Sequence, residues 1–298
     1  MEKNNYSIKE KEAIAKNLTD ISFDELEEQF LKLKELKCNL INTLSHVGSD
    51  VVNYFTFVER LNTAGHSGYS FFDVWYSRKF IQTKKYSKSL FKYYKKNNIT
   101  DEYFIMYRIF NLYFGAVSIF KPVIAKYIYC KFKPKKILDF TMGWGGRLVG
   151  ACALDIEKYI GIDLNQKLKK PYTEMTKFLD KYSDTKFDIY FEDAATFDYS
   201  KLDYDFVLTS PPYYNIELYT GTEKRDIEEW NNNFYIPVFT NTYKYMKSGY
   251  YCLNIPQNIY NDVALKVLGK PYKKILFPKA KRTQDEKYKE YIYVWKKD

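Results

Sequence analysis

The spacing of apolar residues divides the chain into two parts with different periodicities. In the first part, a capping box at Ser22–Glu25 is followed by apolar residues that recur every three or four positions as far as Leu44. This spacing predicts one long amphipathic helix that ends near Leu44. The glycines of GHSG (65–68) and the Asn pair at 97–98 predict breaks between further helices. We therefore expect residues 1–112 to be mainly helical.

The second part, residues 113–298, alternates short apolar runs with amphipathic stretches. That alternation is typical of an α/β domain with a parallel sheet. We expect strands at 135–140, 158–163, 187–192, 203–209, 249–255, 272–278 and 290–296, and helices at 144–154, 166–181, 227–247 and 258–268. No helix-length pattern separates the last two runs, which predicts an antiparallel pair. The expected fold is α/β, with a mostly parallel seven-stranded sheet and a C-terminal antiparallel hairpin, preceded by the helical region.

The net charge of +10 is concentrated in one segment. Residues 51–136 carry 16 Lys and Arg against 4 Asp and Glu, whereas residues 137–298 carry 24 against 23. In KFIQTKKYSKSLFKYYKKNN (79–98), aromatic residues alternate with lysines, which offers cations to phosphates and rings to bases. The candidate nucleic-acid contacts in this stretch are Lys84, Lys85, Lys88, Lys92, Lys95 and Lys96. A solvated helix face is the alternative. For Lys281 and Arg282, between the last two strands, phosphate contact and solvation are both open.

The residue inventory does not indicate metal or disulfide chemistry. The four cysteines (38, 130, 152 and 252) have no CxxC spacing, and there are two histidines. We expect neither a zinc site nor a disulfide framework, which fits a reducing compartment. The charged first residues lack a signal-peptide core, and no stretch reaches the ~18 apolar residues of a membrane span. We therefore expect a soluble, intracellular protein of the cytoplasm, nucleoid or nucleus, without a membrane partner.

A glycine-rich loop follows the first expected strand. In DFTMGWGGR (139–147), Gly143, Gly145 and Gly146 let the backbone approach a ligand closely. The carboxyl end of a first strand is also where α/β folds bind nucleotides. The spacing is neither GxGxxG nor Walker A, which argues against a dinucleotide or ATP. A purely structural loop is the alternative.

Acidic residues end the next two expected strands. Asp163 is placed to accept both hydroxyls of a ribose, and Glu192 and Asp193 lie where an adenine ring would be. Each acid alone is more typical of a helix N-cap. Because the glycine loop and the acids end three consecutive strands, however, chance is a less satisfactory explanation.

The fourth strand ends in TSPPYYN (209–215), where two prolines stop the sheet ladder. Together with the glycine loop, this segment resembles the S-adenosylmethionine-dependent amino-methyltransferases, which modify the exocyclic nitrogen of cytosine or adenine in DNA. Four residues match the [DNS]-P-P-[YFW] tetrapeptide of that family in full: Ser210, Pro211, Pro212 and Tyr213. The glycine loop is similar to the DPFxGxGT loop of the family, and Lys121-Pro122 resembles its Lys-Pro before the first strand. The resemblance covers residues 115–298.

The resemblance implies a Rossmann-like methyltransferase domain at 113–298, with S-adenosylmethionine as cofactor and DNA as substrate. It implies that Ser210 Oγ and the Pro211 carbonyl hold the target amine, and that Tyr213 stacks on a flipped base. The implied cofactor-binding residues are Lys121, Pro122, Asp139, Thr141, Gly143, Gly145, Gly146, Asp163, Glu192, Asp193 and Asn215. Neither a metal nor a covalent nucleophile is needed.

Some features depart from the family or leave its properties open. Phe140-Thr141 replaces the usual Pro-Phe, and Gly146 replaces a Thr, so the loop packing differs and one hydroxyl contact is missing. Ser in the first position of the tetrapeptide slightly favours cytosine N4 over adenine N6. An RNA or protein-amide methyltransferase, and an inactive nucleic-acid-binding module, are alternative hypotheses. Because the last strand ends the chain, we expect target recognition from residues 1–112 or from insertions at 216–235 and 279–289.

Overall fold

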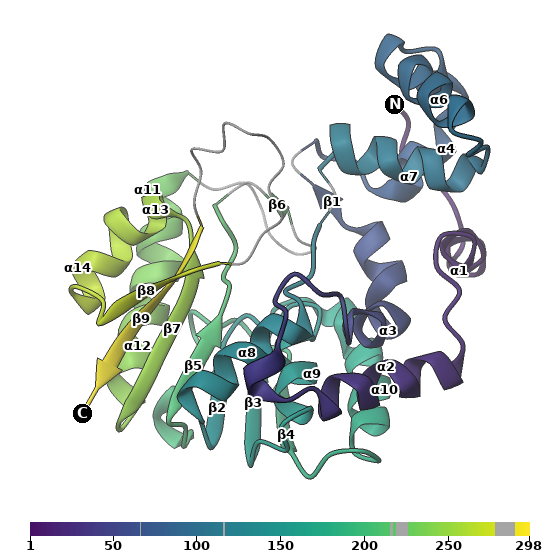
Figure 1. The fold of residues 1–298 in the computed structure, drawn as a ribbon. Coiled ribbons are helices and arrows are strands. Elements are labelled where there is room, and N and C mark those ends of the chain that lie inside the picture. The colour runs from purple at the N-terminus through teal and green to yellow at the C-terminus, as the bar shows by residue number, and fades with distance from the viewer. Residues whose placement is uncertain (66, 116, 215–216, 219–225, 278–289) are drawn as a thin grey trace. The chain divides into compact units, whose positions relative to one another are not determined.

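The computed structural model describes residues 1–65, 67–115, 117–214, 217–218, 226–277 and 290–298 (Figure 1). These residues form two compact units. The helical unit contains the described residues of 1–22, 56–118 and 215–224, and the sheet unit contains those of 23–55, 119–214 and 225–298. A single division after residue 112 does not reproduce these units, because residues 23–55 belong with the sheet.

The sheet unit contains seven strands in the order β4-β3-β2-β5-β7-β9-β8. Their bounds are β2 Lys136–Asp139, β3 Lys158–Ile162, β4 Lys186–Tyr190, β5 Phe206–Thr209, β7 Gly249–Ile255, β8 Lys273–Leu276 and β9 Tyr291–Lys297. The first five in this order pair in parallel, whereas β9 is antiparallel to both β7 and β8. The predicted α/β fold, with its mostly parallel seven-stranded sheet and C-terminal hairpin, is confirmed, and the topology is Rossmann-like.

Both faces of the sheet are covered by helices. Successive side chains of a strand point to opposite faces, so neighbouring residues of one strand contact different helices. The ring of Phe206 lies 5.9 Å from that of Tyr129 and 5.6 Å from that of Phe132, both on α8. The next residue, Val207, belongs to the core cluster that contains Phe239 of α12. The helices of this unit are α2 Phe23–Glu35, α8 Pro122–Phe132, α9 Gly146–Cys152, α10 Lys169–Leu179, α11 Ile227–Trp230, α12 Ile236–Tyr245, α13 Gln257–Ile259 and α14 Leu265–Leu268. The described residues therefore place helices on both sides of a largely parallel sheet.

Residues 23–55 join the sheet unit through specific contacts. The ring of Phe30 lies 6.0 Å from that of Phe178 on α10. The buried Lys126 Nζ of α8 donates to the Leu33 carbonyl at 2.6 Å. The predicted helix through residue 44 ends earlier, at Glu35. Of the later apolar positions, Leu36 is half-buried, whereas Leu40 and Leu44 are exposed. The apolar spacing therefore continues past the end of the helix, at positions that are only partly buried or exposed.

The expectation of no disulfide is wrong at one pair. Cys38 and Cys130 form a disulfide, with their Cα atoms 5.7 Å apart. Their separation of 92 residues gives no spacing signal. Only the packing of the 3₁₀ turn Cys38–Leu40 on α8 brings them together. Cys152 and Cys252 are buried free thiols.

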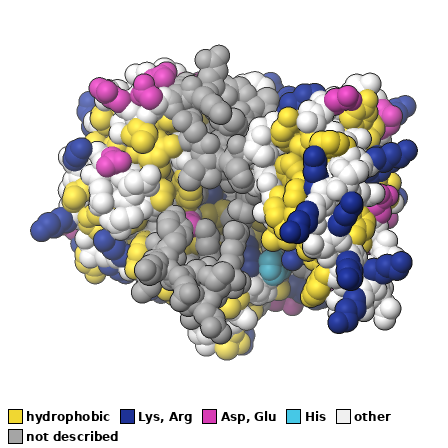
Figure 2. Space-filling view, turned by 90° about the horizontal axis from the view of Figure 1, so that it is seen from above, with side chains coloured by type: hydrophobic (Ala, Val, Ile, Leu, Met, Phe, Trp, Pro, Cys, Tyr) yellow, Lys and Arg dark blue, Asp and Glu magenta, His cyan; other side chains and the backbone are white. Residues whose placement is uncertain are grey.

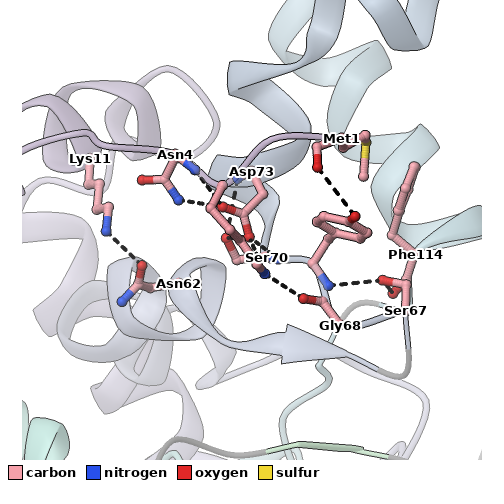
Figure 3. A network of polar contacts seen from close by, with 11 residues as sticks. Met1, Asn4, Lys11, Asn62, Ser67, Gly68, Ser70, Asp73 and Phe114 are labelled. Atoms are coloured by element: carbon pink, nitrogen blue, oxygen red, sulfur yellow. Dashed lines mark hydrogen bonds and ion pairs between the residues drawn. The ribbon is translucent and has the colours of Figure 1, made fainter.

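The helical unit has its own apolar core and its own buried polar anchor. Its elements are α1 Ile8–Lys16, the end of α3 Ser49–Asn62, α4 Phe71–Tyr76, α5 Arg78–Gln82, α6 Lys85–Lys96, α7 Glu102–Tyr113, and the β1 Ala64–Gly65 and β6 Glu217–Leu218 pair. Asp73 is buried and accepts hydrogen bonds from the backbone and side chain of Asn4, at 2.8 and 2.7 Å, and from Ser70 (Figure 3). Lys3 pairs with the same carboxylate at 3.1 Å. Asp73 therefore ties the first residues of the chain to α4.

Within the described ranges, no helix is long and apolar enough to cross a membrane. The same ranges contain no group of three or more His, Cys, Asp or Glu side chains that could hold a metal ion.

Candidate functional site

The glycine loop, the acids after β3 and β4, and the SPPY segment lie at one edge of the sheet. The parallel strands β4, β3, β2, β5 and β7 all end at this edge. The chain runs outward in one direction from β2 through β3 to β4, and in the other from β5 to β7. Such a reversal between β2 and β5 is the place where open α/β sheets bind ligands. Because β9 is antiparallel and pairs Tyr291 with Ile255, its first residues lie at the same edge.

The glycine loop after β2 has a conformation that requires glycine. Gly145 adopts φ +91°, a left-handed value. A Cβ at Gly146 would lie 1.8 Å from the Phe120 carbonyl oxygen, so the loop packs directly on the backbone before α8. The Tyr172 hydroxyl of α10 donates to the Met142 and Gly143 carbonyls at 3.2 and 3.0 Å. Close contact with the backbone thus explains why residue 146 is a glycine, and α10 stabilises the loop through the Tyr172 hydroxyl.

Asp139 and Thr141 hold the loop to its neighbours. The fully buried Asp139 carboxylate accepts from Arg147 Nε at 2.6 Å, Tyr159 at 2.5 Å and Thr209 at 2.8 Å. Thr141 Oγ1 lies 2.6 Å from Thr209 Oγ1. Burial opposes the charge of Arg147, but the adjacent Asp139 outweighs burial and raises the pKa of the guanidinium above its usual value. These side chains fasten the ends of β2 and β5 together.

Asp163 lies directly beside the glycine loop. Its carboxylate accepts from Gly143 N at 2.8 Å and from Asn165 N at 2.9 Å, and the residue is only partly buried. Burial raises the pKa of Asp163, against the lowering by these two backbone donors. A carboxylate has about four acceptor positions, so two remain for a ligand.

The acids after β4 have a more local environment. Asp193 Oδ1 accepts from Ala195 N at 2.9 Å, which closes a turn. Glu192 is exposed, and Gln166 Nε2 donates to the Phe191 carbonyl at 2.7 Å. The structure therefore places both acids at the predicted strand end and gives Asp193 a turn-forming role.

The SPPY segment follows β5 and is joined to β7 and to the start of β9 by hydrogen bonds. Ser210 Oγ lies 3.2 Å from the Tyr213 hydroxyl and 3.4 Å from Asn254 Oδ1. The Tyr213 hydroxyl lies 2.9 Å from Glu290 Oε1 and 3.2 Å from Asn254 Oδ1. Asn254 Nδ2 donates to Glu290 Oε1 at 2.9 Å. Ser210 and Tyr213 thus belong to one polar cluster with Asn254 and Glu290.

The turn after the prolines is held by buried tyrosines. Tyr235 donates to the Pro212 carbonyl and accepts from Tyr214 N at 3.2 Å. Tyr214 adopts φ +51°, which is strained for a residue with a bulky side chain. Its hydroxyl lies 3.3 Å from Asp262 Oδ2, and burial raises the pKa of Tyr214 to about 12. The backbone on both sides of Tyr213 is therefore hydrogen-bonded to the Tyr235 hydroxyl.

The Lys-Pro pair opens α8 as expected. Pro122 is the buried first residue of the helix. Lys121 Nζ donates to the Leu44 carbonyl at 3.0 Å and lies 3.4 Å from His46 Nε2. Partial burial lowers the pKa of Lys121. In this structure its ammonium contacts the 44–46 turn, and a cofactor role for Lys121 stays a prediction, as it does for Asn215, which lies outside the described residues.

The candidate nucleic-acid lysines lie on α6 of the helical unit, or at its N-cap. Four recur at helical spacing on the face opposite the buried Ser87 and Tyr94: Lys85, Lys88, Lys92 and Lys95. All six candidates are exposed, and none forms an ion pair with a carboxylate among the described residues. Figure 2 shows Lys and Arg side chains interspersed with hydrophobic ones over this unit. We call these four lysines the lysine stripe. Lys281 and Arg282 lie outside the described residues.

Four site residues escaped the sequence analysis. Arg147 directly follows Gly146, and a charged residue at that position was the feature of the sequence that could have indicated a role in the site. Tyr172, Asn254 and Glu290 carry no motif, and Glu290 was assigned only as the first residue of a strand. Strand pairing alone brings Asn254 and Glu290 to the SPPY segment.

Comparisons with known proteins place the chain near solved structures only. No family model matches the chain, and no curated protein matches it. TrmN from Thermus thermophilus is 16% identical over 59% of this chain, with a TM-score of 0.38, and the match spans 49% of TrmN, about half its length. A SAM-dependent O-methyltransferase from Thermotoga maritima is 15% identical over 64% of this chain and 69% of its own, with a TM-score of 0.39. An rRNA methylase from Streptococcus thermophilus is 12% identical over 61% of this chain and 99% of its own, with a TM-score of 0.35. No activity of this chain follows from similarities at this level.

Proposed function

We propose that this chain is an S-adenosylmethionine-dependent methyltransferase that modifies an exocyclic amine of a flipped base in DNA, with cytosine N4 favoured over adenine N6. The observation that carries the proposal is the position of the SPPY segment. It ends β5, immediately beside β2 and its glycine loop, at the point where the strand order reverses. A methyl donor at the loop and an amine at Ser210 would therefore be neighbours.

The residues beside the glycine loop fit the cofactor. Asp163 retains acceptor positions for a ribose diol, and hydroxyl donors there would offset the burial that raises its pKa. Gly145 has a left-handed φ, and a Cβ there would lie 2.8 Å from Met175 Sδ, so glycine lets the loop pack closely on α10. When bound, S-adenosylmethionine supplies a methyl group that its sulfonium already activates. The protein then has to bind and orient, without a metal or a covalent nucleophile.

The SPPY segment supplies the orientation. Ser210 Oγ and the Pro211 carbonyl accept from the two N–H groups of the target amine, which favours a pyramidal nitrogen whose lone pair faces the methyl group. Tyr213 offers its ring to the base, which must leave a duplex or be single-stranded. Correct orientation alone accounts for up to about 7–11 kcal/mol of a barrier in well-aligned systems. The anchored turn at Tyr214 supports this role because it limits movement of the segment.

The lysine stripe supports a nucleic-acid substrate. Exposed ammonium groups at helical spacing neutralise successive phosphates and release counterions. This attraction does not distinguish DNA from RNA. DNA is proposed on the SPPY resemblance, and the polymer is the first quantity to measure.

The test is labelled methyl transfer from S-adenosylmethionine to DNA and RNA pools, followed by nucleoside analysis. We expect label in DNA, as N4-methylcytosine or N6-methyladenine. Label in RNA alone would replace DNA as the substrate and keep the amine chemistry. Label in neither polymer, with a folded and cofactor-binding protein, would overturn the proposal in favour of a protein amide or of a binding module without turnover.

A further inference from the structure

Glu290 is a buried carboxylate for which the proposed mechanism has no use. It is 5% exposed, precedes β9, and lies at the strand edge that carries the SPPY segment. Its Oε1 lies within hydrogen-bond distance of both the Tyr213 hydroxyl and Asn254 Nδ2, at 2.9 Å each. A buried carboxylate is costly to keep unless it is hydrogen-bonded. These contacts therefore connect it to the proposed substrate site.

The proton inventory of this cluster sets the direction of its hydrogen bonds. Tyr213 has one hydroxyl proton, and its hydroxyl lies 3.2 Å from the Asn254 carbonyl, from Asn254 Oδ1 and from Ser210 Oγ. The shortest contact, 2.9 Å, is to Glu290 Oε1, which as a carboxylate can only accept and attracts the proton most strongly. Asn254 directs its amide protons at Glu290 and at the Tyr291 carbonyl, 3.3 Å away, so its Oδ1 faces Tyr213 and Ser210 as an acceptor. Both neighbours of Ser210 thus present oxygen lone pairs.

Ser210 is left with two acceptors, both inside the cluster. Its hydroxyl proton goes inward, to the Tyr213 oxygen at 3.2 Å or to Asn254 Oδ1 at 3.4 Å. The remaining lone pairs of Ser210 Oγ then face away from the cluster. A serine held in this way accepts a hydrogen bond from a ligand and does not donate one.

We propose that Glu290, acting through Tyr213 and Asn254, is a positioning residue that makes Ser210 an obligate acceptor, so that the site selects a base presenting an amine over one presenting a carbonyl oxygen. This inference rests on the proposed function and deepens it. It assigns the Tyr213 hydroxyl a role separate from stacking of its ring. It also predicts that cytosine is favoured over uracil or thymine, whose carbonyl at the corresponding position would meet lone pairs.

The sheet holds the cluster in place. Asn254 is 2% exposed and pairs with Ile292 across the β7–β9 ladder. Glu290 directly precedes β9, so the same ladder sets its position. Because Asn254 is in β7 and Glu290 directly precedes β9, the direction of the hydrogen bonds is set before a base arrives.

The test uses Tyr213→Phe, Glu290→Met and the double variant in the full chain. Tyr213→Phe keeps the ring and removes the proton given to Glu290, and Glu290→Met removes the acceptor at similar length. We expect each to lower kcat by about 10- to 100-fold, with cofactor Kd unchanged, because a hydrogen bond to a charged group is lost. The double variant should be no slower than the slower single variant, since both break one chain. Glu290→Gln, which keeps an acceptor oxygen, should recover most of the activity.

The matched control is Tyr293→Phe, which removes another hydroxyl from the same sheet, one that donates to Gln257 at 2.9 Å. It should leave kcat unchanged. A second double-mutant cycle compares the thermal unfolding of the unmodified protein, the two single variants and the double variant. Their losses of stability should also be non-additive, and this readout needs no turnover. Full activity of Tyr213→Phe, or additive losses in both cycles, would overturn the inference while leaving the proposed function intact. Absence of transfer by the unmodified protein would overturn both.

Discussion

The polar groups of the SPPY segment and those of the lysine stripe are satisfied in opposite ways. Ser210 and Tyr213 are partly buried, and other protein groups meet their hydroxyls within 3.4 Å. The lysines on α6 are exposed, without ion pairs among the described residues. The first arrangement has a definite direction, and the second has only a sign of charge. Preorganised dipoles suit a reaction, whereas exposed cations suit attraction to a polyanion.

The energies of the two regions differ for the same reason. Hydrogen bonds at the SPPY segment act in a setting of low dielectric, where they are strong and costly to break. The lysine stripe acts through water, and salt screens charges beyond about 8–10 Å. We therefore expect single substitutions to matter greatly at the strand edge and little on α6.

The largest effect is expected from Ser210→Ala. Removing one oriented polar group at a reacting centre costs about 10²–10³-fold in kcat, or roughly 2.7–4 kcal/mol. The Kd for S-adenosylmethionine should not change, because Ser210 lies after β5 and Asp163 after β3. Single-turnover methyl transfer and calorimetry measure the two quantities. Ser200→Ala, in an exposed turn, serves as control. A fully active Ser210→Ala would show that a single substitution at the SPPY segment matters as little as one on α6.

Asp73 lies in the helical unit, like the lysine stripe, but it is buried and hydrogen-bonded, like the SPPY segment. Its substitution therefore tests whether a large effect follows from burial or from belonging to the sheet unit. Burial opposes its charge, but bonds from Asn4 and Ser70 outweigh burial and lower the pKa of Asp73 to about 2. A depressed carboxyl pKa stabilises the fold above the unfolded value of 3.8, and this stability is lost as the pH falls from 3.8 through 2. Asp73→Asn should therefore lower the unfolding free energy by about 2 kcal/mol at pH 7 and by little at pH 2.

Chemical denaturation of the full chain at both pH values measures this difference. Asp180→Asn is the matched control, because Asp180 is exposed at the C-terminal end of α10. An equal loss at pH 7 and pH 2 would show that the Asp73 effect is packing and not charge.

Asp163→Ala should weaken S-adenosylmethionine binding by about tenfold, because it removes the acceptor for the ribose and the partner of Gly143 N. Because the pKa of Asp163 is raised, lowering the pH should weaken S-adenosylmethionine binding as the substitution does. As the pH falls, protonation removes the carboxylate, and affinity should fall earlier than for an ordinary aspartate. Calorimetry between pH 4 and 8 checks both points, with Glu174→Ala on α10 as control. Unchanged affinity would remove Asp163 from the site.

The smallest effect per residue is expected on α6. Each Lys→Gln change at Lys88 or Lys92 should lower the salt slope of DNA binding by about 0.9 and leave thermal unfolding unchanged, because both side chains are exposed. Binding titrations at several salt concentrations measure the slope, with Lys177→Gln on α10 as a control outside α6. A slope that does not change would show that the stripe is a solvated face.

Much of the sheet unit could be predicted from local patterns. All seven expected strands are present within a few residues, because alternating and continuous apolar runs follow directly from burial on a sheet. The helix expected at 227–247 is present as α11 and α12, joined by a π-helical turn. The error at residues 36–44 arose because apolar spacing persists beyond Glu35, although Leu40 and Leu44 are exposed and the chain there is not helical beyond a 3₁₀ turn.

What the sequence determined by itself is the set of strands, the glycine loop, and the acids and SPPY segment at their ends, since these depend on neighbouring residues. Tertiary structure alone decided the pairing of Cys38 with Cys130, the assignment of 23–55 to the sheet unit, and the contact of Glu290 with Tyr213. Each of these joins positions far apart in the chain. Local propensity contains no term for such contacts, whereas strand order and helix packing create them.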